Sequence, residues 1–185
     1  THIKNVELIL KKLNFEFIHD DLNILDNRIY ENSINFNGNY IVIHFDEKWI
    51  HNKYILSYIN IEPNEEQLVS FLNSIVDRTN KKILITTGKQ SPKILNKIFL
   101  KNINPKIKFL DNLNFYQVEK VISNCDLLIS CHGAVSHICS AKNIPQIDII
   151  DPSYKYSLWT DHFRKYTSIN RSSFIELSRT ILNFL

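Results

Sequence analysis

The chain has 185 residues, of which 44% are hydrophobic and 22% are charged, and its formal net charge at pH 7 is +3. These proportions are typical of one globular domain, and they exclude a disordered chain, a collagen and a coiled coil. The basic residues are spread along the sequence rather than gathered in a block, so we expect no nucleic-acid partner. The chain begins at Thr1 and has no Met, so we interpret it as the C-terminal part of a longer protein.

The cysteines and the length of the apolar stretches bear on where in the cell the protein is found. Cys125, Cys131 and Cys139 are an odd number of cysteines without a pairing pattern, which is typical of a reducing environment. The longest apolar stretches, such as Ile144–Ile150, are far too short to cross a bilayer. We therefore expect a cytoplasmic protein.

Short apolar runs alternate with longer segments of helical period from Tyr40 onward. The predicted strands are Tyr40–Phe45, Lys82–Thr87, Ile107–Leu110, Asp126–Ser130 and Pro145–Ile150. The predicted helices are Asn64–Thr79, Ser91–Leu100, Phe115–Asn124, Ala134–Lys142, Leu158–Tyr166 and Ser173–Phe184. Apolar strands that are each followed by a helix predict an α/β fold with a doubly wound, Rossmann-like parallel sheet of five or six strands.

Polar residues mark the starts of three of these helices. Asn64 with Gln67, and Asn114 with Gln117, fit the capping box, and Ser91–Pro92 fits an N-cap followed by proline at the first helical position.

Residues 1–39 differ in pattern from the remainder. Val6–Leu13 has the period of a short helix, and Phe15–Asn39 is irregular and rich in Asn. We interpret residues 1–39 as a linker or N-terminal arm and residues 40–185 as the Rossmann-like domain.

Ligands of an open parallel sheet bind beyond the carboxyl ends of its strands. Two of the three glycines, Gly88 and Gly133, fall in such loops, where each would admit a ligand or simply provide a positive φ. Ser130–His137 joins a strand to a helix, and the backbone amides of such a helix start suit a phosphate. Ser136 and His137 would add donors from the first turn, unless His137 faces solvent.

Other chemistries fit this segment less well. The sequence has neither G-x-G-x-x-G nor G-x-x-x-x-G-K-[ST]. Cys131, His132, His137 and Cys139 lack the spacing of a zinc site, so we expect no metal. Cys131 with His132 as its base is not favoured, because adjacent residues on a turn point apart, although a helix start would lower the pKa of the thiol.

The segment DLLIS-CHGAVSH-ICSAKNIP-QIDII resembles the C-terminal half of GT-B glycosyltransferases, most closely the heptosyltransferases of lipopolysaccharide synthesis. YIVIHF followed by Asp46-Glu47-Lys48-Trp49 and Lys53 resembles the first strand of that half with its Lys/Trp-bearing loop, and KILITTGK resembles the strand that ends in glycine. The resemblance covers most of residues 40–160. The chain departs from the family where Cys131 or His132 replaces an acidic residue, and where Gly133 and His137 are one residue further apart.

The resemblance implies the domain that binds a nucleotide-diphosphate-sugar donor in a metal-independent enzyme of surface polysaccharide or lipopolysaccharide synthesis. A glycan or glycolipid acceptor and the catalytic base would belong to an N-terminal half, so this chain alone would be inactive, and no catalytic residue is assigned. Neither a cofactor nor a metal is implied, and the enzyme would be cytoplasmic with peripheral contact to the inner membrane. The expected donor-binding residues are Lys48, Lys53, Gly88, Lys89, Asp111, Cys131, His132, Gly133, Ala134, Val135, Ser136 and His137.

Two other functions stay open. A sugar-nucleotide epimerase or hydrolase of the same fold would need a base facing the donor, and His132 and Asp111 are the candidates. A non-catalytic binding module would keep the fold without the chemistry.

Overall fold

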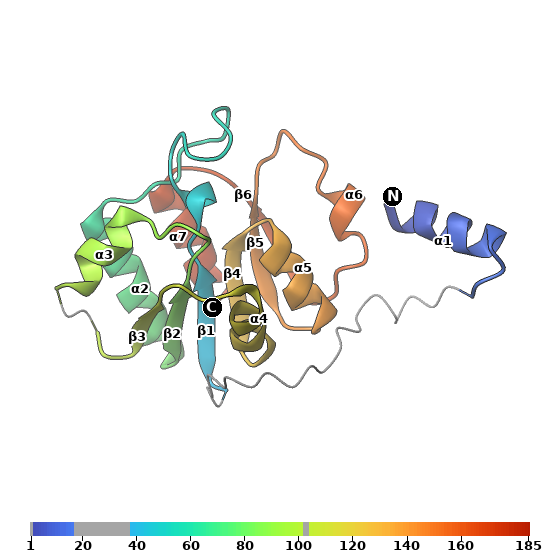
Figure 1. Cartoon of the computed structure of the whole chain (residues 1–185). Coiled ribbons are helices and arrows are strands. Elements are labelled where there is room, and N and C mark those ends of the chain that lie inside the picture. The colour runs from blue at the N-terminus through green and yellow to red at the C-terminus, as the bar shows by residue number, and fades with distance from the viewer. Residues whose placement is uncertain (1, 17–37, 102–103) are drawn as a thin grey trace.

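A six-stranded, entirely parallel sheet in the order β3-β2-β1-β4-β5-β6 lies at the centre of the structure. The structure, a computed structural model, describes residues 2–16, 38–101 and 104–185 (Figure 1). The strands are β1 (Tyr40–His44), β2 (Lys82–Thr86), β3 (Ile107–Leu110), β4 (Leu127–Cys131), β5 (Gln146–Ile150) and β6 (Tyr166–Asn170). The strand order reverses between β1 and β4, and this reversal is where a doubly wound sheet opens a crevice for a ligand. The predicted α/β class is confirmed.

Helices cover both faces of the sheet, as Figure 1 shows. The helices are α1 (His2–Lys12), the 3-10 turn η2 (Glu47–Trp49), α2 (Glu65–Thr79), α3 (Lys93–Phe99), α4 (Phe115–Ser123), α5 (Ala134–Ala141), α6 (Ser157–Thr160) and α7 (Phe174–Asn183). Helices α2, α3 and α7 pack on one face, and α4 and α5 pack on the other.

The alternation of side chains along β1 divides the core between these two faces. Ile41 and Ile43 pack with the residues of α2, α3 and α7. Tyr40 and Val42 pack with the residues of α4 and α5. All five residues of β1 are buried, which is the pattern of a central parallel strand. Burial on both faces holds β1 in the centre of the sheet, and the segment that follows β1 therefore begins at the carboxyl edge of the central strands.

The predicted capping boxes of α2 and α4 are confirmed. Asn64 and Gln67 exchange two side chain-to-backbone hydrogen bonds of 2.9 Å, and Asn114 and Gln117 do the same at 2.9 and 2.8 Å. The prediction for α3 is wrong by one residue. Pro92 is the N-cap and α3 begins at Lys93, because the Ser91 hydroxyl donates to the Asp111 carboxylate instead of capping the helix.

The predicted helix Leu158–Tyr166 is wrong. Helix α6 ends at Thr160, Lys165 adopts a left-handed φ of 36°, and the chain then forms β6 against β5. Strand β6 lies at the edge of the sheet, and Ile169 is its one buried residue. An edge strand with a single buried side chain lacks the apolar run by which the other strands were predicted.

Helix α1 spans His2–Lys12, so it begins before the predicted Val6–Leu13 helix. Most of the Asn-rich stretch lies outside the described residues, and the division into residues 1–39 and 40–185 stays a prediction. No helix among residues 2–16, 38–101 and 104–185 is both long and apolar enough to span a membrane.

Candidate functional site

Two neighbouring cavities open where the strands end. The larger has a volume of about 720 Å³ and lies between the segments that follow β1 and β2 and the start of α5. The smaller has a volume of about 330 Å³ and lies between the segment after β1, the start of α5 and the segment after β5. Ala134, the first residue of α5, lines both cavities. The start of α5 therefore lies between the two cavities.

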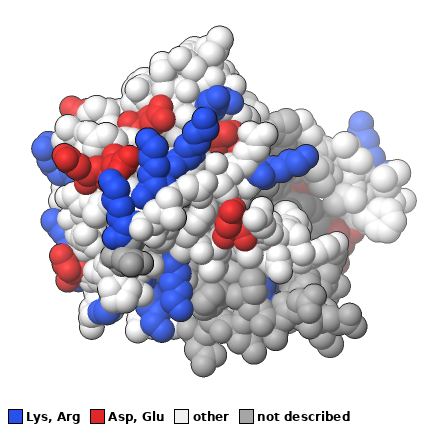
Figure 2. Space-filling model, turned by 60° about the vertical axis from the view of Figure 1, so that its left-hand side comes forward, with Lys and Arg blue, Asp and Glu red and all other residues white. Residues whose placement is uncertain are grey.

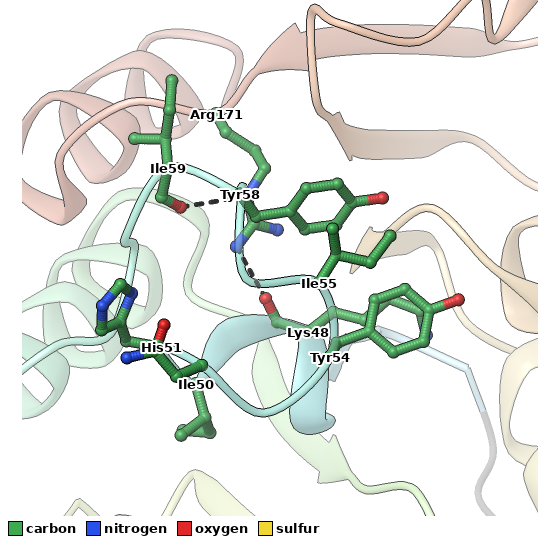
Figure 3. A pocket seen from close by; sticks show the side chains of 9 residues that line it. Lys48, Ile50, His51, Tyr54, Ile55, Tyr58, Ile59 and Arg171 are labelled. Carbon is green, nitrogen blue, oxygen red and sulfur yellow. Dashed lines mark hydrogen bonds between the residues drawn. The ribbon is translucent and has the colours of Figure 1, made fainter.

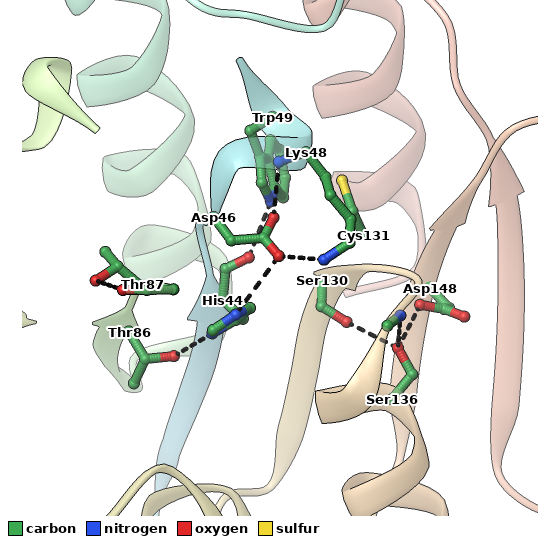
Figure 4. Close-up of polar contacts among 12 residues, drawn as sticks. His44, Asp46, Lys48, Trp49, Thr86, Thr87, Ser130, Cys131, Ser136 and Asp148 are labelled. Carbon is green, nitrogen blue, oxygen red and sulfur yellow. Dashed lines mark hydrogen bonds and ion pairs between the residues drawn. The ribbon is translucent and has the colours of Figure 1, made fainter. Parts of the chain in front are cut away.

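Asp46 is the centre of a buried charge network beside the larger cavity. It is the N-cap of η2, and its carboxylate accepts from the Lys48 backbone amide at 3.1 Å. The Lys48 ammonium lies 2.5 Å from the same carboxylate, which is only 3% exposed (Figure 4). Burial alone would lower the pKa of Lys48, but the charge and hydrogen bond of Asp46 outweigh it and raise that pKa. Lys48 therefore holds a positive charge at neutral pH in a partly buried position.

His44 adjoins this network from β1. Its Nδ1 lies 2.9 Å from the Thr86 hydroxyl, and its Nε2 lies 3.6 Å from the Asp46 carboxylate. Burial lowers the pKa of His44, and the Asp46 charge opposes this only in part. The imidazole is therefore held neutral at pH 7. The Trp49 indole donates to the His44 carbonyl at 2.9 Å and fixes η2 over the end of β1.

Asp148 is the centre of a second buried network, under the smaller cavity. This residue of β5 is fully buried, and its carboxylate accepts from the Ser136 hydroxyl at 2.8 Å and the Tyr166 hydroxyl at 3.1 Å. His132 Nδ1 lies 2.6 Å from the same carboxylate. Figure 4 shows Asp148 beside Ser136 of α5. The three donors come from β6, from α5 and from the loop before it, so this carboxylate joins three segments at the edge of the cavity.

Gly133 is required by a close approach rather than by its backbone angle. Its φ of 176° is extended, so the alternative that the glycine provides a positive φ is wrong here, and it is also wrong for Gly88. A Cβ at Gly133 would lie 3.0 Å from the Lys48 ammonium nitrogen, and one at Gly88 would lie 2.8 Å from the Glu47 carboxylate. Both glycines keep space for charged groups of η2.

Arg171 ties the segment after β1 to the end of β6. Its guanidinium donates to the Lys48 carbonyl at 2.7 Å and to the Ile59 carbonyl at 3.2 Å, as Figure 3 shows. The same group lies 4.7 Å from the centre of the Tyr58 ring and is almost completely buried. Because the guanidinium bonds to carbonyls at both ends of the segment from Lys48 to Ile59, it holds that segment in place.

Cys131 is the last residue of β4 and lies between the two networks. It is buried, and its thiol lies 3.5 Å from the Arg171 guanidinium. Burial raises the pKa of Cys131 far above its ordinary value, so the expected lowering by the helix start is wrong. The thiol is neutral and does not line either cavity.

The structure gathers most of the predicted residues at the two cavities. Lys48, Lys53, Gly88, Lys89, Ala134 and Val135 line the larger one, and His132, Gly133, Ala134 and His137 line the smaller one. Ser136 is buried against Asp148 rather than exposed to a ligand. Asp111 lines neither cavity and is bonded to Ser91.

Sequence reasoning missed four residues that organise the site: His44, Asp46, Asp148 and Arg171. A signal existed for Asp148, because a carboxylate inside an otherwise apolar buried strand needs donors around it. No local signal marks Arg171, whose two carbonyl partners lie more than a hundred residues earlier in the chain.

Charged residues of both signs line the larger cavity, whereas the smaller one is lined mainly by aromatic and histidine side chains. The larger one is lined by Lys53, Lys89 and Lys93 as well as by Glu47 and Glu62. Figure 2 shows Lys and Arg side chains interspersed with Asp and Glu on one face of the molecule. Within the described residues, no group of three or more His, Cys, Asp or Glu side chains could hold a metal ion.

Solved structures share this fold, although no protein-family model and no curated protein matches the chain. E. coli heptosyltransferase WaaC with ADP-2-deoxy-2-fluoro heptose matches 97% of this chain over 54% of its own length, at 13% identity and a TM-score of 0.59. E. coli ADP-heptose lps heptosyltransferase II matches 78% of this chain over 44% of its own length, at 12% identity and a TM-score of 0.58.

A UDP-GlcNAc 2-epimerase from Methanocaldococcus jannaschii matches 83% of this chain over 39% of its own length, at 14% identity and a TM-score of 0.54. The chain therefore spans about half, or less, of each of these three proteins. At these identities the likeness establishes the fold, which is a Rossmann-like part of the GT-B architecture shared by glycosyltransferases and this epimerase.

Proposed function

We propose that this chain is the donor-binding, C-terminal half of a GT-B glycosyltransferase and that it binds a nucleotide-diphosphate sugar. One observation carries the proposal: the Lys48 ammonium and the start of α5 meet at Gly133, between the two cavities. A fixed cation beside free helix amides is an arrangement that stabilises a diphosphate.

Each part of the ligand has a place in this geometry. The larger cavity has the volume of a small-molecule pocket and takes the nucleoside. The first amides of α5, at Ala134 and Val135, have no helical carbonyl to bond and donate to the diphosphate. Lys53 and Lys89, which are exposed at the rim, add positive charge from the other side.

The fold neighbours support a nucleotide-sugar ligand. WaaC is bound to ADP-2-deoxy-2-fluoro heptose in one solved structure. The M. jannaschii epimerase is bound to UDP-GlcNAc and UDP in another, which matches 78% of this chain at a TM-score of 0.52. We infer a ligand of the same class here and leave its base and sugar open.

The remaining parts of the proposal concern the whole enzyme. A longer protein would supply a glycan or glycolipid acceptor site and the catalytic base, and it would act in the cytoplasm at the inner-membrane surface in polysaccharide or lipopolysaccharide synthesis. The charge that develops on the departing diphosphate would be stabilised by Lys48 and the helix start, without a metal.

Ligand titration of the chain itself tests this proposal. We expect UDP or ADP to bind with a calorimetric signal and the corresponding nucleoside to bind much more weakly. At a hundred times its dissociation constant, the bound ligand should add about 2.7 kcal/mol to the free energy of unfolding. We also expect no sugar transfer by this chain alone. Robust transfer by the chain alone, or equal affinity for nucleoside and diphosphate, would contradict the proposal.

An epimerase or hydrolase is the second candidate, and the pairing of His132 with Asp148 favours it. Of the two bases considered for such an enzyme, Asp111 lines neither cavity and is bonded to Ser91 at the larger one, whereas His132 lines the smaller one. Exchange of a sugar proton with deuterated water would support the epimerase, and transfer by a full-length protein would support the transferase. Binding with neither activity would indicate a binding module.

A further inference from the structure

The smaller cavity has a wall of aromatic side chains that the proposed function does not use. Residues 50–61, after β1, and residues 151–160, after β5, supply this wall. Its side chains are Tyr54, Tyr58, Tyr154, Tyr156 and Trp159. Tyr54, Tyr154 and Trp159 are 53%, 44% and 39% exposed. Large exposed aromatic groups that lie together around a cavity mark a binding site.

Contacts behind the rings hold this wall in place. The Arg171 guanidinium lies 4.7 Å from the centre of the Tyr58 ring, and the Tyr58 hydroxyl lies 3.3 Å from that of Tyr156. The Tyr156 hydroxyl accepts from the Asp151 backbone amide at 3.4 Å. Figure 3 shows the rings of Tyr54 and Tyr58 on the same side of their segment. The contact between the two hydroxyls therefore joins segments that lie 98 residues apart in sequence.

The rings of the wall are tilted against one another instead of lying in parallel stacks. The ring centres of Tyr58 and Tyr154 are 5.9 Å apart, at an interplanar angle of 81°. Those of Tyr156 and Trp159 are 6.2 Å apart, at 65°. A flat nucleobase gains most from a ring that lies parallel to it on each side, and these pairs do not offer that. A puckered ligand with C–H bonds on several sides fits tilted faces better.

The polarity of the lining favours a neutral ligand with hydroxyl groups. None of the described residues that line the smaller cavity is Lys, Arg, Asp or Glu. A cation would find no carboxylate there, and the Lys48 ammonium lies 5.3 Å from the centre of the Tyr54 ring. A purely apolar ligand would desolvate the tyrosine hydroxyls and the imidazoles of His132 and His137 without bonding to them. A sugar ring has both C–H faces and hydroxyl groups.

We propose that this aromatic cavity is a glycan-binding site, which holds a neutral pyranose ring against Tyr154 and Trp159 independently of any nucleotide. Its volume of about 330 Å³ is at the lower end of the range for small-ligand pockets and suits one sugar ring. The exposure of the two side chains leaves room for further sugars outside the cavity. Because Ala134 lines both cavities, a glycan held here would lie beside the donor. Only that last step rests on the proposed function.

Saturation-transfer NMR tests the site with the free methyl glycosides of glucose, galactose, mannose and N-acetylglucosamine. We expect at least one glycoside to bind, with saturation reaching its ring C–H protons, and to bind equally well with and without excess UDP. Trp159 provides a second signal, because its fluorescence should change on binding, whereas Trp49 is fully buried and should not respond.

Variants identify the aromatic wall, with thermal melts to check that each is folded. Trp159→Ala and Tyr154→Ala should each weaken glycoside binding about tenfold. Trp159→Phe keeps an aromatic face and should retain most of the affinity. Phe115→Ala, at an exposed ring of α4 that lines neither cavity, is the matched control and should change nothing. The affinities for UDP and ADP should be the same in every variant.

The outcomes separate this inference from the proposed function. Failure of every glycoside to bind, or binding that Trp159→Ala and Tyr154→Ala leave intact, would overturn the glycan site. If the free glycosides do not bind but Trp159→Ala weakens UDP-glucose or UDP-N-acetylglucosamine, the cavity holds the sugar of the donor, and the inference is overturned too. Binding of UDP or ADP would leave the proposed function standing in both cases. Glycoside binding without UDP or ADP binding would support the glycan site and contradict the donor site.

Discussion

The Lys48 ammonium lies 3.0 Å from the point where a Cβ at Gly133 would stand, so these two residues cannot both be large. Moving Lys48 away would separate its ammonium from the buried Asp46 carboxylate. The absence of a side chain at Gly133 thus keeps one cation beside the start of α5. This relationship connects a loop after β1 with a helix after β4, across the point where the strand order reverses.

Gly133→Val is expected to weaken diphosphate binding far more than nucleoside binding. The new side chain displaces the Lys48 ammonium and covers the helix amides, while the extended φ of this position adds no backbone strain. The loss should be roughly 1.5–3 kcal/mol, the value of a hydrogen bond to a charged group. Calorimetric titration with both ligands measures it. Equal losses for both would place the phosphate elsewhere.

Lys48→Met is expected to destabilise the fold as well as the complex. It leaves the Asp46 carboxylate buried without its ammonium partner, which costs about 3–5 kcal/mol. Adding Asp46→Asn removes that charge and should restore much of the stability without restoring diphosphate binding. Urea unfolding and calorimetry of both single variants and the double variant complete the cycle. A double variant that regains full affinity would contradict the assigned role of Lys48.

The free energy of unfolding is expected to fall as the pH drops below about 6.5. The folded chain lowers the pKa of His44 and His137 below the ordinary 6.5, so the unfolded chain binds more protons in acid. The stabilisation is complete above that pH and is lost progressively below it. Urea unfolding at several pH values gives the free energy of unfolding as a function of pH. This pH dependence should be weaker in His44→Gln and unchanged from wild type in His51→Gln. An unchanged pH dependence in His44→Gln would count against a neutral buried His44.

Arg171→Lys is expected to loosen the segment from Lys48 to Ile59. A single ammonium cannot reach both carbonyls or lie flat on the Tyr58 ring as the guanidinium does. Amide hydrogen exchange in this segment should accelerate, and the diphosphate should bind more weakly because Lys48 is less fixed. Arg179→Lys, at an exposed position of α7, is the matched control. Equal exchange in both variants would refute the role of Arg171.

Diphosphate binding is expected to persist in excess EDTA. The positive charges that face the ligand in this geometry are Lys48, Lys53, Lys89, Lys93 and the start of α5, and we expect them to act without a bridging cation. Titration with and without the chelator checks this. Loss of binding in EDTA that magnesium or manganese restores would contradict it.

Periodicity was sufficient for five strands and most of the helices, because their burial is reflected in local apolar runs. β6 could not be predicted in this way, since one buried side chain in five gives no run. The loops at the site followed from the same rule, because parallel strands end at one edge of the sheet. The residues that a loop side chain contacts could not be predicted in the same way. That Lys48 pairs with Asp46 and approaches Gly133 depends on how β1 and β4 are placed side by side, which local sequence does not encode.

Strand β6 also decides when the site can exist. Tyr166, at its start, donates to Asp148, and Arg171, directly after its end, holds the segment that carries Lys48. During synthesis, β1 and β4 leave the ribosome well before either residue is available. If the proposed site binds a nucleotide, the chain should become able to retain it only after residue 171 has emerged. Early intermediates would hold the central sheet but have little affinity for the ligand.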